Sequence, residues 1–277
     1  MRVERHYDVT AFYEHAGPFL LEREAQHSVQ LGFRTSLERD LHAYGPADPL
    51  LLTVAANGRV VGVAIQTPPH ALLLSEMPRE AVEALVEELR GHDLPGVGAR
   101  VEVGAAFVEL WPAPARVEFE QRIYSCDAVR SPREVPGAMR PYRDADRRLA
   151  GAWVDAFTAE AMPGSDEGSG EAFVQRRLAA GAAVRFREDG GEPVSFLVYG
   201  SPTANGMRVG PVYTPPELRG RGYASALTAA ATQEILDGGK RFACLITDLA
   251  NPTSNSIYQQ VGYSPVVDVN LWRFERA

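Results

Sequence analysis

Residues 219–224, Arg-Gly-Arg-Gly-Tyr-Ala, combine residue types that bind an anion at the start of a helix. Gly220 and Gly222 let the backbone turn tightly and leave its N–H groups uncovered. A helix expected from about residue 223 to 236 adds unpaired N–H groups and the positive end of its dipole. Arg219 and Arg221 add full charges that can reach a phosphate. The segment therefore predicts a site for a diphosphate.

The spacing of these residues argues against two known kinds of phosphate-binding turn. A phosphate loop of the nucleoside-triphosphatase type needs a lysine after its second glycine, and none follows Gly222. A dinucleotide-binding turn needs Gly or Ala where Ser225 stands. An ordinary strand-to-helix turn with solvated arginines stays open as well, because a short Gly/Arg motif alone does not exclude it.

A second polar motif, at residues 251–263, is typical of a short helix. Asn251 suits the N-cap, and Pro252 suits the first helical position. Gly262 can end the helix in the left-handed conformation. A buried strand expected at residues 242–247 leads into this helix.

Taken together, the two motifs resemble those of the GNAT family, the GCN5-related N-acetyltransferases. The first matches the Arg-x-x-Gly-x-Ala acyl-CoA loop, and the second fills every position of N-x-x-[SA]-x-x-x-Y-x-x-x-G-[FY]. The resemblance implies acetyl-CoA as cosubstrate. The residues expected to bind it are Val212, Tyr213, Thr214, Arg219, Gly220, Arg221, Gly222, Tyr223, Ala224, Ser225, Asn251 and Asn255.

By this resemblance Tyr258 is the candidate general acid. Attack of an amine on a thioester expels a thiolate whose conjugate acid has a pKa of about 8.5, judged from cysteine. A phenol beside the sulfur can hydrogen-bond to the thiolate and supply a proton. The alternative is a half-buried helix tyrosine with a satisfied hydroxyl. Asn251 is expected at the pantetheine arm, although capping alone would explain it, and Asn255 needs no ligand to explain it.

The strand expected at residues 207–213 has a further implied role. In the family this strand separates from its neighbour, and its free backbone groups pair with the pantetheine amides. Gly210 and Pro211 weaken normal strand pairing, although an edge strand or a bulge suits them equally. A backbone N–H of Val212 or Tyr213 is a candidate to stabilise the tetrahedral oxyanion.

The attacking amine must be neutral, so a base or a water chain to a base is expected. Glu160 would end the first helix of the C-terminal half, near the implied acceptor pocket. Asp248 would end the buried strand and face the cleft. Glu217 is a third candidate, but exposed acids are common in turns.

Composition limits the class of protein. The chain has 277 residues, of which 45% are hydrophobic and 23% charged, which is ordinary for a soluble protein of two domains. No segment is long and apolar enough for a membrane span or a signal peptide, so a cytoplasmic protein without membrane partners is expected. The net charge of −8 argues against nucleic-acid binding. Two cysteines and no zinc-binding pattern predict neither a disulfide framework nor a metal site.

The order of elements predicts an α/β fold with a mixed sheet, built as two tandem GNAT-like units. In the C-terminal half the two motifs are preceded by two helices and a hairpin and followed by a strand. A Gly/Ser/acid loop at residues 163–170 could close over the acceptor or simply connect two helices. The expected ranges are helices 147–160 and 171–179, hairpin strands 182–187 and 193–199, and a last strand 265–274.

The N-terminal half has a similar order but lacks the anion motif. Glu76 and Glu80 stand near the expected helix start, where they would favour the helix dipole but repel a diphosphate. We therefore expect a degenerate, non-catalytic unit at 1–135 and a catalytic unit at 136–277, with an unrelated α/β domain as the alternative for the first. The expected elements are one or two helices within 12–42, a hairpin of strands 50–56 and 59–66, a strand 71–74, a helix 75–90, a strand 101–103, a helical turn 105–111 and a strand 117–126.

These expectations define one favoured function and two rivals. The favoured function is direct transfer of the acetyl group of acetyl-CoA to a primary amine of a small molecule or peptide. The first rival is a CoA-binding sensor or partner module without turnover, and the second is a dinucleotide-binding oxidoreductase. A monomer or a homodimer is expected, because two fused units could replace the pairing of single units.

Overall fold

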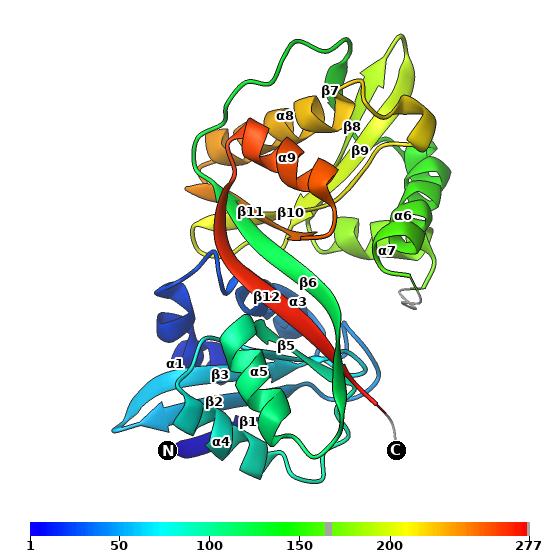
Figure 1. The fold of residues 1–277 in the computed structure, drawn as a ribbon. Helices are drawn as coiled ribbons and strands as arrows, with labels where there is room; N and C mark the ends of the chain where they lie inside the picture. The colour runs from blue at the N-terminus through cyan, green and yellow to red at the C-terminus, as the bar shows by residue number, and fades with distance from the viewer. Residues whose placement is uncertain (164–167, 276–277) are drawn as a thin grey trace. The chain divides into compact units, whose positions relative to one another are not determined.

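The computed structural model describes residues 1–163 and 168–275, so the centre of the expected loop at 163–170 lies outside the described residues. Contacts divide the chain into unit 1, Met1–Ile123 with Val266–Ala277, and unit 2, Tyr124–Pro265 (Figure 1). This division differs from the expected ranges 1–135 and 136–277 in two places. Residues 124–135 pack with the second unit, and the C-terminal strand packs with the first.

Unit 1 contains a mixed sheet with the strand order β1-β2-β3-β4-β5-β12-β6. The hairpin of β2 and β3 has the bounds expected from its alternation and its Asn-Gly turn. The elements of this unit are β1 Arg2–His6, α1 Val9–Leu21, α2 Ser28–Gly32, α3 Arg34–Arg39, β2 Leu50–Ala56, β3 Arg59–Gln66, β4 Leu72–Leu74, α4 Arg79–Glu88, β5 Gly96–Arg100, α5 Val101–Leu110, β6 Ala115–Cys126 and β12 Ser264–Phe274.

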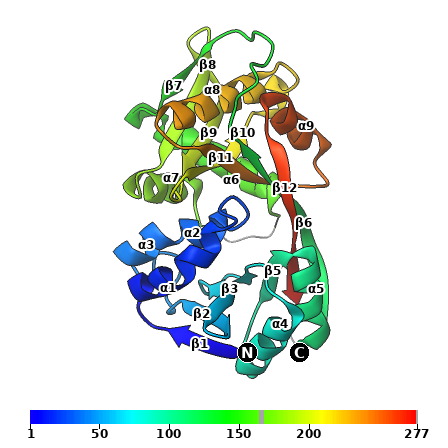
Figure 2. The same cartoon turned by 90° about the vertical axis from the view of Figure 1, so that its left-hand side faces the viewer.

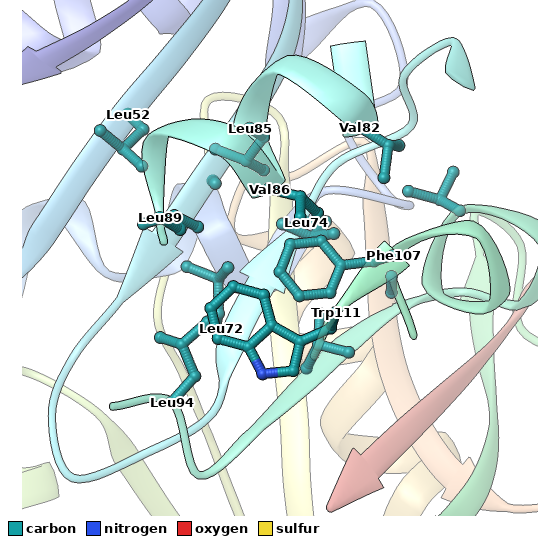
Figure 3. Packing of buried hydrophobic residues seen from close by; sticks show 14 of the residues in the cluster. Leu52, Leu72, Leu74, Val82, Leu85, Val86, Leu89, Leu94, Phe107 and Trp111 are labelled. Atoms are coloured by element: carbon teal, nitrogen blue, oxygen red, sulfur yellow. The ribbon is translucent and has the colours of Figure 1, made fainter. Parts of the chain in front are cut away.

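Helices cover both faces of this sheet, with α1–α3 on one side and α4 and α5 on the other (Figure 2). Successive side chains of a strand point to opposite faces. Leu51 of β2 therefore packs with Phe12 of α1, whereas Leu52 packs with Leu85 of α4. Figure 3 shows the cluster on the α4 side of the sheet, in which Leu74 and Val86 lie beside the Phe107 ring of α5.

The C-terminal strand β12 belongs to unit 1, which corrects the expectation that it completes the C-terminal sheet. It pairs antiparallel with β5, with Asn270 opposite Ala99. Phe274 stacks on the Phe107 and Trp111 rings at centroid distances of 6.4 and 5.6 Å. An apolar pattern predicts that a strand is buried, but it does not say in which of two sheets.

Unit 2 has the strand order β6-β11-β10-β9-β8-β7 and places α6 and α7 on one face and α8 and α9 on the other. The predicted helices and strands of this half are confirmed to within a few residues, except that β7 was not expected. The elements are β7 Ala138–Pro141, α6 Arg147–Ala161, α7 Gly170–Ala179, β8 Ala183–Asp189, β9 Glu192–Gly200, β10 Gly206–Tyr213, α8 Tyr223–Asp237, β11 Phe242–Asp248 and α9 Pro252–Val261, with short 3-10 turns at Asp144–Asp146 and Pro216–Leu218.

Three local predictions in unit 1 are wrong. Residues 101–103 begin helix α5 rather than form a strand, although valine favours strands. Helix α4 begins at Arg79 rather than near Ser75, whose hydroxyl instead accepts a hydrogen bond from the Val63 N–H (2.8 Å). The region 12–42 lies in three helices instead of one or two. Strands β1 and β5 were not expected.

Among the described residues, no helix has both the length and the apolar character needed to cross a bilayer. Cys126 and Cys244 are buried thiols of unit 2.

Candidate functional site

The parallel strands β10 and β11 separate in unit 2. Their pairing ends at Arg208 opposite Cys244, although β10 continues to Tyr213 and β11 to Asp248. The other edge of β10 stays paired with β9 through an irregular register. The separation predicted around Gly210 is thus confirmed, and beyond Arg208 one edge of β10 has no strand partner among the described residues.

A cavity of about 880 Å³ lies at this separation, bordered by the end of β10 and the starts of α8 and α9. Most of the predicted site residues line it: Glu160, Val212, Tyr213, Thr214, Arg219, Gly220, Gly222, Tyr223, Ala224, Ser225, Asn251 and Tyr258. Three predicted residues, Arg221, Asp248 and Asn255, do not line it. The lining also includes residues that sequence reasoning missed, among them Phe157 and Ser254 and, from the segment before β7, Pro132, Arg133 and Val135.

The start of α8 has the bare backbone that an anion site needs. Gly222 is its N-cap, with a left-handed φ of 87° and no side-chain cap. The first helical bond is donated by the Ala226 N–H to the Gly222 carbonyl (3.0 Å). In the described part of the chain we find no acceptor for the N–H groups of Tyr223, Ala224 or Ser225. Together with the helix dipole, these donors favour a phosphate.

Arg219 is not directed at this helix start. Its guanidinium donates to both carboxylate oxygens of Glu160 (2.9 and 2.8 Å) and to the Thr214 carbonyl (2.9 Å). It also lies over the Tyr213 ring, 5.6 Å from the centroid. The charge predicted to reach a phosphate is therefore balanced by the Glu160 carboxylate.

Tyr258 of α9 lines the cavity and is half-buried against the core. Its ring meets Tyr263 edge to face, with centroids 5.9 Å apart. No hydrogen-bond partner for its hydroxyl is found within residues 1–163 and 168–275. Burial raises the pKa of Tyr258 to about 12, so the phenol is protonated at neutral pH and can donate.

The polar residues at the start of α9 mainly build its local structure. Asn251 caps the helix by accepting from the Ser254 N–H (3.0 Å), as predicted. Asn255 donates to the carbonyls of Asp248 (2.8 Å) and Asn251 (2.7 Å) and accepts from the Tyr124 hydroxyl (3.1 Å). Asn255 is therefore fully engaged in joining α9 to β11 and β6.

Of the three candidate bases only Glu160 lines the cavity. Asp248 accepts from a backbone N–H two residues on (2.7 Å), which shapes the turn before α9. Glu217 is exposed in the 3-10 turn. Among the described residues, no group of three or more His, Cys, Asp or Glu could hold a metal ion.

Comparisons with known proteins agree with this geometry. Residues 194–273 match the family model described as FR47-like protein. A GNAT-family acetyltransferase from Colwellia psychrerythraea is 10% identical with a TM-score of 0.61, and the match covers 99% of this chain and 100% of that one. A tandem GNAT protein of the clavulanic acid biosynthesis pathway is 14% identical with a TM-score of 0.58, covering 98% and 97%. A Drosophila protein is 15% identical with a TM-score of 0.68, covering 99% and 98%.

These likenesses span both units, and the chain therefore has the tandem GNAT fold that the order of its helices and strands predicted. A search of curated proteins finds no match to this sequence. The dinucleotide-binding alternative loses its support, because β8, β9 and β10 run antiparallel whereas a doubly wound domain needs a parallel sheet.

Proposed function

We propose that this protein is an N-acetyltransferase, which moves the acetyl group of acetyl-CoA to a primary amine of a small molecule or peptide. One observation carries the proposal. The uncapped start of α8 and the Tyr258 hydroxyl, which has no hydrogen-bond partner in the described part of the chain, line the same cavity at the point where β10 and β11 separate. The fold likeness to GNAT acetyltransferases supports it.

Successive parts of the cavity wall suit the diphosphate, the pantetheine arm and the thioester of acetyl-CoA. The bare amides at residues 223–225 would bind the diphosphate. The free edge of β10 at Val212 and Tyr213, with Thr214 just beyond it, would pair with the amides of the pantetheine arm, as an added strand does. With the pantetheine arm along β10, the thioester would lie near Tyr258. The amine would then bind at the part of the wall formed by Phe157 and Glu160.

In the reaction the amine nitrogen forms a bond to the acetyl carbon, and the C–S bond breaks. Tyr258 donates a hydrogen bond to the leaving sulfur. Since its pKa of about 12 exceeds the value of about 8.5 expected for the thiol, hydrogen-bond stabilisation of the thiolate is favoured over complete proton transfer. The N–H of Val212 or Tyr213 is the proposed donor to the oxyanion.

Glu160 is the proposed acceptor of the amine proton, directly or through water, because the other two acids do not line the cavity. Its carboxylate would also attract the ammonium form of the substrate. Arg219 holds Glu160 through two hydrogen bonds and so acts as a positioning residue.

The test is thiol release from acetyl-CoA over a panel of aminoglycosides, amino acids, polyamines and peptides. We expect at least one amine to accelerate release. Binding of acetyl-CoA without release for any amine would favour the CoA-binding sensor instead. Stabilisation by a nicotinamide cofactor, with none by acetyl-CoA, would contradict both readings.

We infer a cytoplasmic enzyme without nucleic-acid or membrane partners, present as a monomer or homodimer, in which the N-terminal repeat is non-catalytic. Light scattering of the purified protein checks the oligomeric state. Retention on heparin at physiological salt would contradict the nucleic-acid expectation.

A further inference from the structure

The segment that joins β6 to β7, residues 127–137, runs past the start of α8 within unit 2; we call it the connector. Its Pro132, Arg133 and Val135 line the cavity. The Arg133 guanidinium lies 3.4 Å from the Gly220 carbonyl oxygen. A Cβ placed on Gly222 would come within 2.9 Å of Val135 Cγ2. The connector therefore packs directly on the two glycines of the anion motif.

Both ends of the connector are held in place. At one end the Arg130 N–H donates to the Val261 carbonyl at the end of α9 (2.8 Å). At the other end the Arg187 side chain of β8, which is 6% exposed, donates to the carbonyls of Val135, Pro136 and Gly137. Three hydrogen bonds from one buried guanidinium fix the backbone just after Arg133. The backbone beside Arg133 is thus held within unit 2, while the Arg133 side chain is exposed.

The charges around the start of α8 do not balance. Arg219 is paired with Glu160, whereas Arg133 has no carboxylate partner in the part of the chain that the structure describes. Arg133 nevertheless lies beside the positive end of the α8 dipole, where a cation is unfavourable unless an anion lies between them. A ligand with two adjacent negative groups would balance the guanidinium and the bare amides together.

We propose that Arg133 binds the diphosphate of coenzyme A and that the connector is one wall of the coenzyme site. This inference rests on the proposed function, because it places the same ligand in the same cavity. It adds a charge contact from a segment that the two sequence motifs do not include. The nucleotide part of the ligand would be held between the connector and α8.

The test measures binding of CoA, dephospho-CoA and S-acetylpantetheine to the full chain by calorimetry. Arg133→Ala should weaken CoA and dephospho-CoA alike, by about tenfold, because it removes one charge-assisted hydrogen bond. Arg133→Glu should weaken them further by repulsion. S-acetylpantetheine lacks the diphosphate, so its affinity should not change.

Arg130→Ala is the matched control, since Arg130 carries the same charge on the same connector but does not line the cavity. It should leave CoA affinity within about twofold, and the melting temperatures of all variants should agree. If the unaltered protein binds CoA and Arg133→Ala binds it equally well, the inference is wrong while the proposed function stands. Weaker binding of CoA but not of dephospho-CoA would assign Arg133 to the 3′-phosphate and overturn the diphosphate contact. An unaltered protein that binds no CoA would defeat the proposed function, and this inference with it.

Discussion

The turn after β4 in unit 1 and the turn after β10 in unit 2 each join a strand to a helix, but their contents differ. The turn after β10 presents two glycines and an uncapped helix start to a cavity. The turn after β4 contains Ser75, Glu76, Met77 and Pro78 and is filled by its own side chains. The same order of elements can thus make a binding site or a packed core.

The details of the unit 1 turn show how it is filled. The Ser75 N–H donates to the Val63 carbonyl (2.9 Å), so the backbone is satisfied within the sheet. Met77 is 7% exposed, and a Cβ on Gly62 would lie 2.8 Å from the Met77 Cβ. Glu76 is paired with Arg23 and Arg100 at the surface. An open site therefore requires both a separated strand pair and the absence of side chains at the helix start.

The largest expected effect is on turnover in unit 2. Tyr258→Phe removes the hydrogen bond to the leaving sulfur and should lower kcat by about 100-fold. Affinity for acetyl-CoA should stay within about twofold, because the phenol does not contact the nucleotide. In the unaltered enzyme, the Tyr258 pKa of about 12 predicts no loss of kcat from this group between pH 7 and 10. Unchanged kcat in the Phe variant would remove Tyr258 from the mechanism.

The next effect concerns the core of unit 1. Met77→Ala should lower the free energy of unfolding by about 2–3 kcal/mol, because it leaves a cavity among buried side chains. Acetyl-CoA affinity should not change, since unit 1 is proposed not to bind it. Met77→Leu conserves volume and should cost less than about 1.5 kcal/mol. Urea unfolding measures the free energy of unfolding, and calorimetry measures the acetyl-CoA affinity. A change in affinity would contradict the assignment of a packed turn to unit 1 and a binding turn to unit 2.

The sequence predicted the local backbone structure around the cavity of unit 2 better than the fold of unit 1, for physical reasons. Glycine conformation and helix capping are local, so Gly222, Asn251 and Gly262 were interpreted correctly. The partner of β12 depends on distant aromatic contacts, which an apolar pattern does not encode. Arg133 was missed for the same reason, because it meets Gly220 across 87 positions of sequence.

The ion pair between Arg219 and Glu160 could not be predicted from the sequence either. Arg219 and Glu160 were each given a separate role, yet they form one bidentate pair. Their separation of 59 positions carries no periodicity that would join them. Asp248 was expected to face the cleft and Asn255 to bind the cosubstrate, yet neither lines the cavity, because both shape the start of α9 instead.

A smaller effect tests the bare start of α8. Gly222→Ala adds a Cβ at a φ of 87°, pressing on Val135 beside the amides, and should weaken CoA binding by about tenfold. Gly239→Ala is the matched control at the other end of the same helix, because its φ is 91° and no atom lies within 4 Å of the added Cβ. Both variants should lose about 1–2 kcal/mol of stability from strain. Equal CoA affinity in the two variants would show that the α8 start does not face the ligand.

The smallest effect compares the first turns of the two units, each between a first strand and a first helix. In unit 2, Asp146 is 9% exposed at its side chain and accepts from the Arg140 guanidinium (2.7 and 2.9 Å) and the Arg143 N–H (2.7 Å). Burial opposes its ionisation, yet these hydrogen bonds hold the pKa of Asp146 below its ordinary value of 3.8. In unit 1, Asp8 is exposed and caps α1 by accepting from the Ala11 N–H (2.7 Å).

Because the pKa of Asp146 is lowered in the folded state, its contribution to stability is complete above about pH 4 and disappears as the pH falls through the folded-state pKa. Asp146→Asn should therefore cost about 1–2 kcal/mol at pH 7 and make unfolding less sensitive to acid below pH 4. Asp8→Asn should cost less than about 0.5 kcal/mol, since Asn caps a helix nearly as well as Asp. Denaturant unfolding at pH 7 and pH 3 distinguishes the two turns, and equal losses at both positions would contradict the assignment of a buried ionic anchor to unit 2.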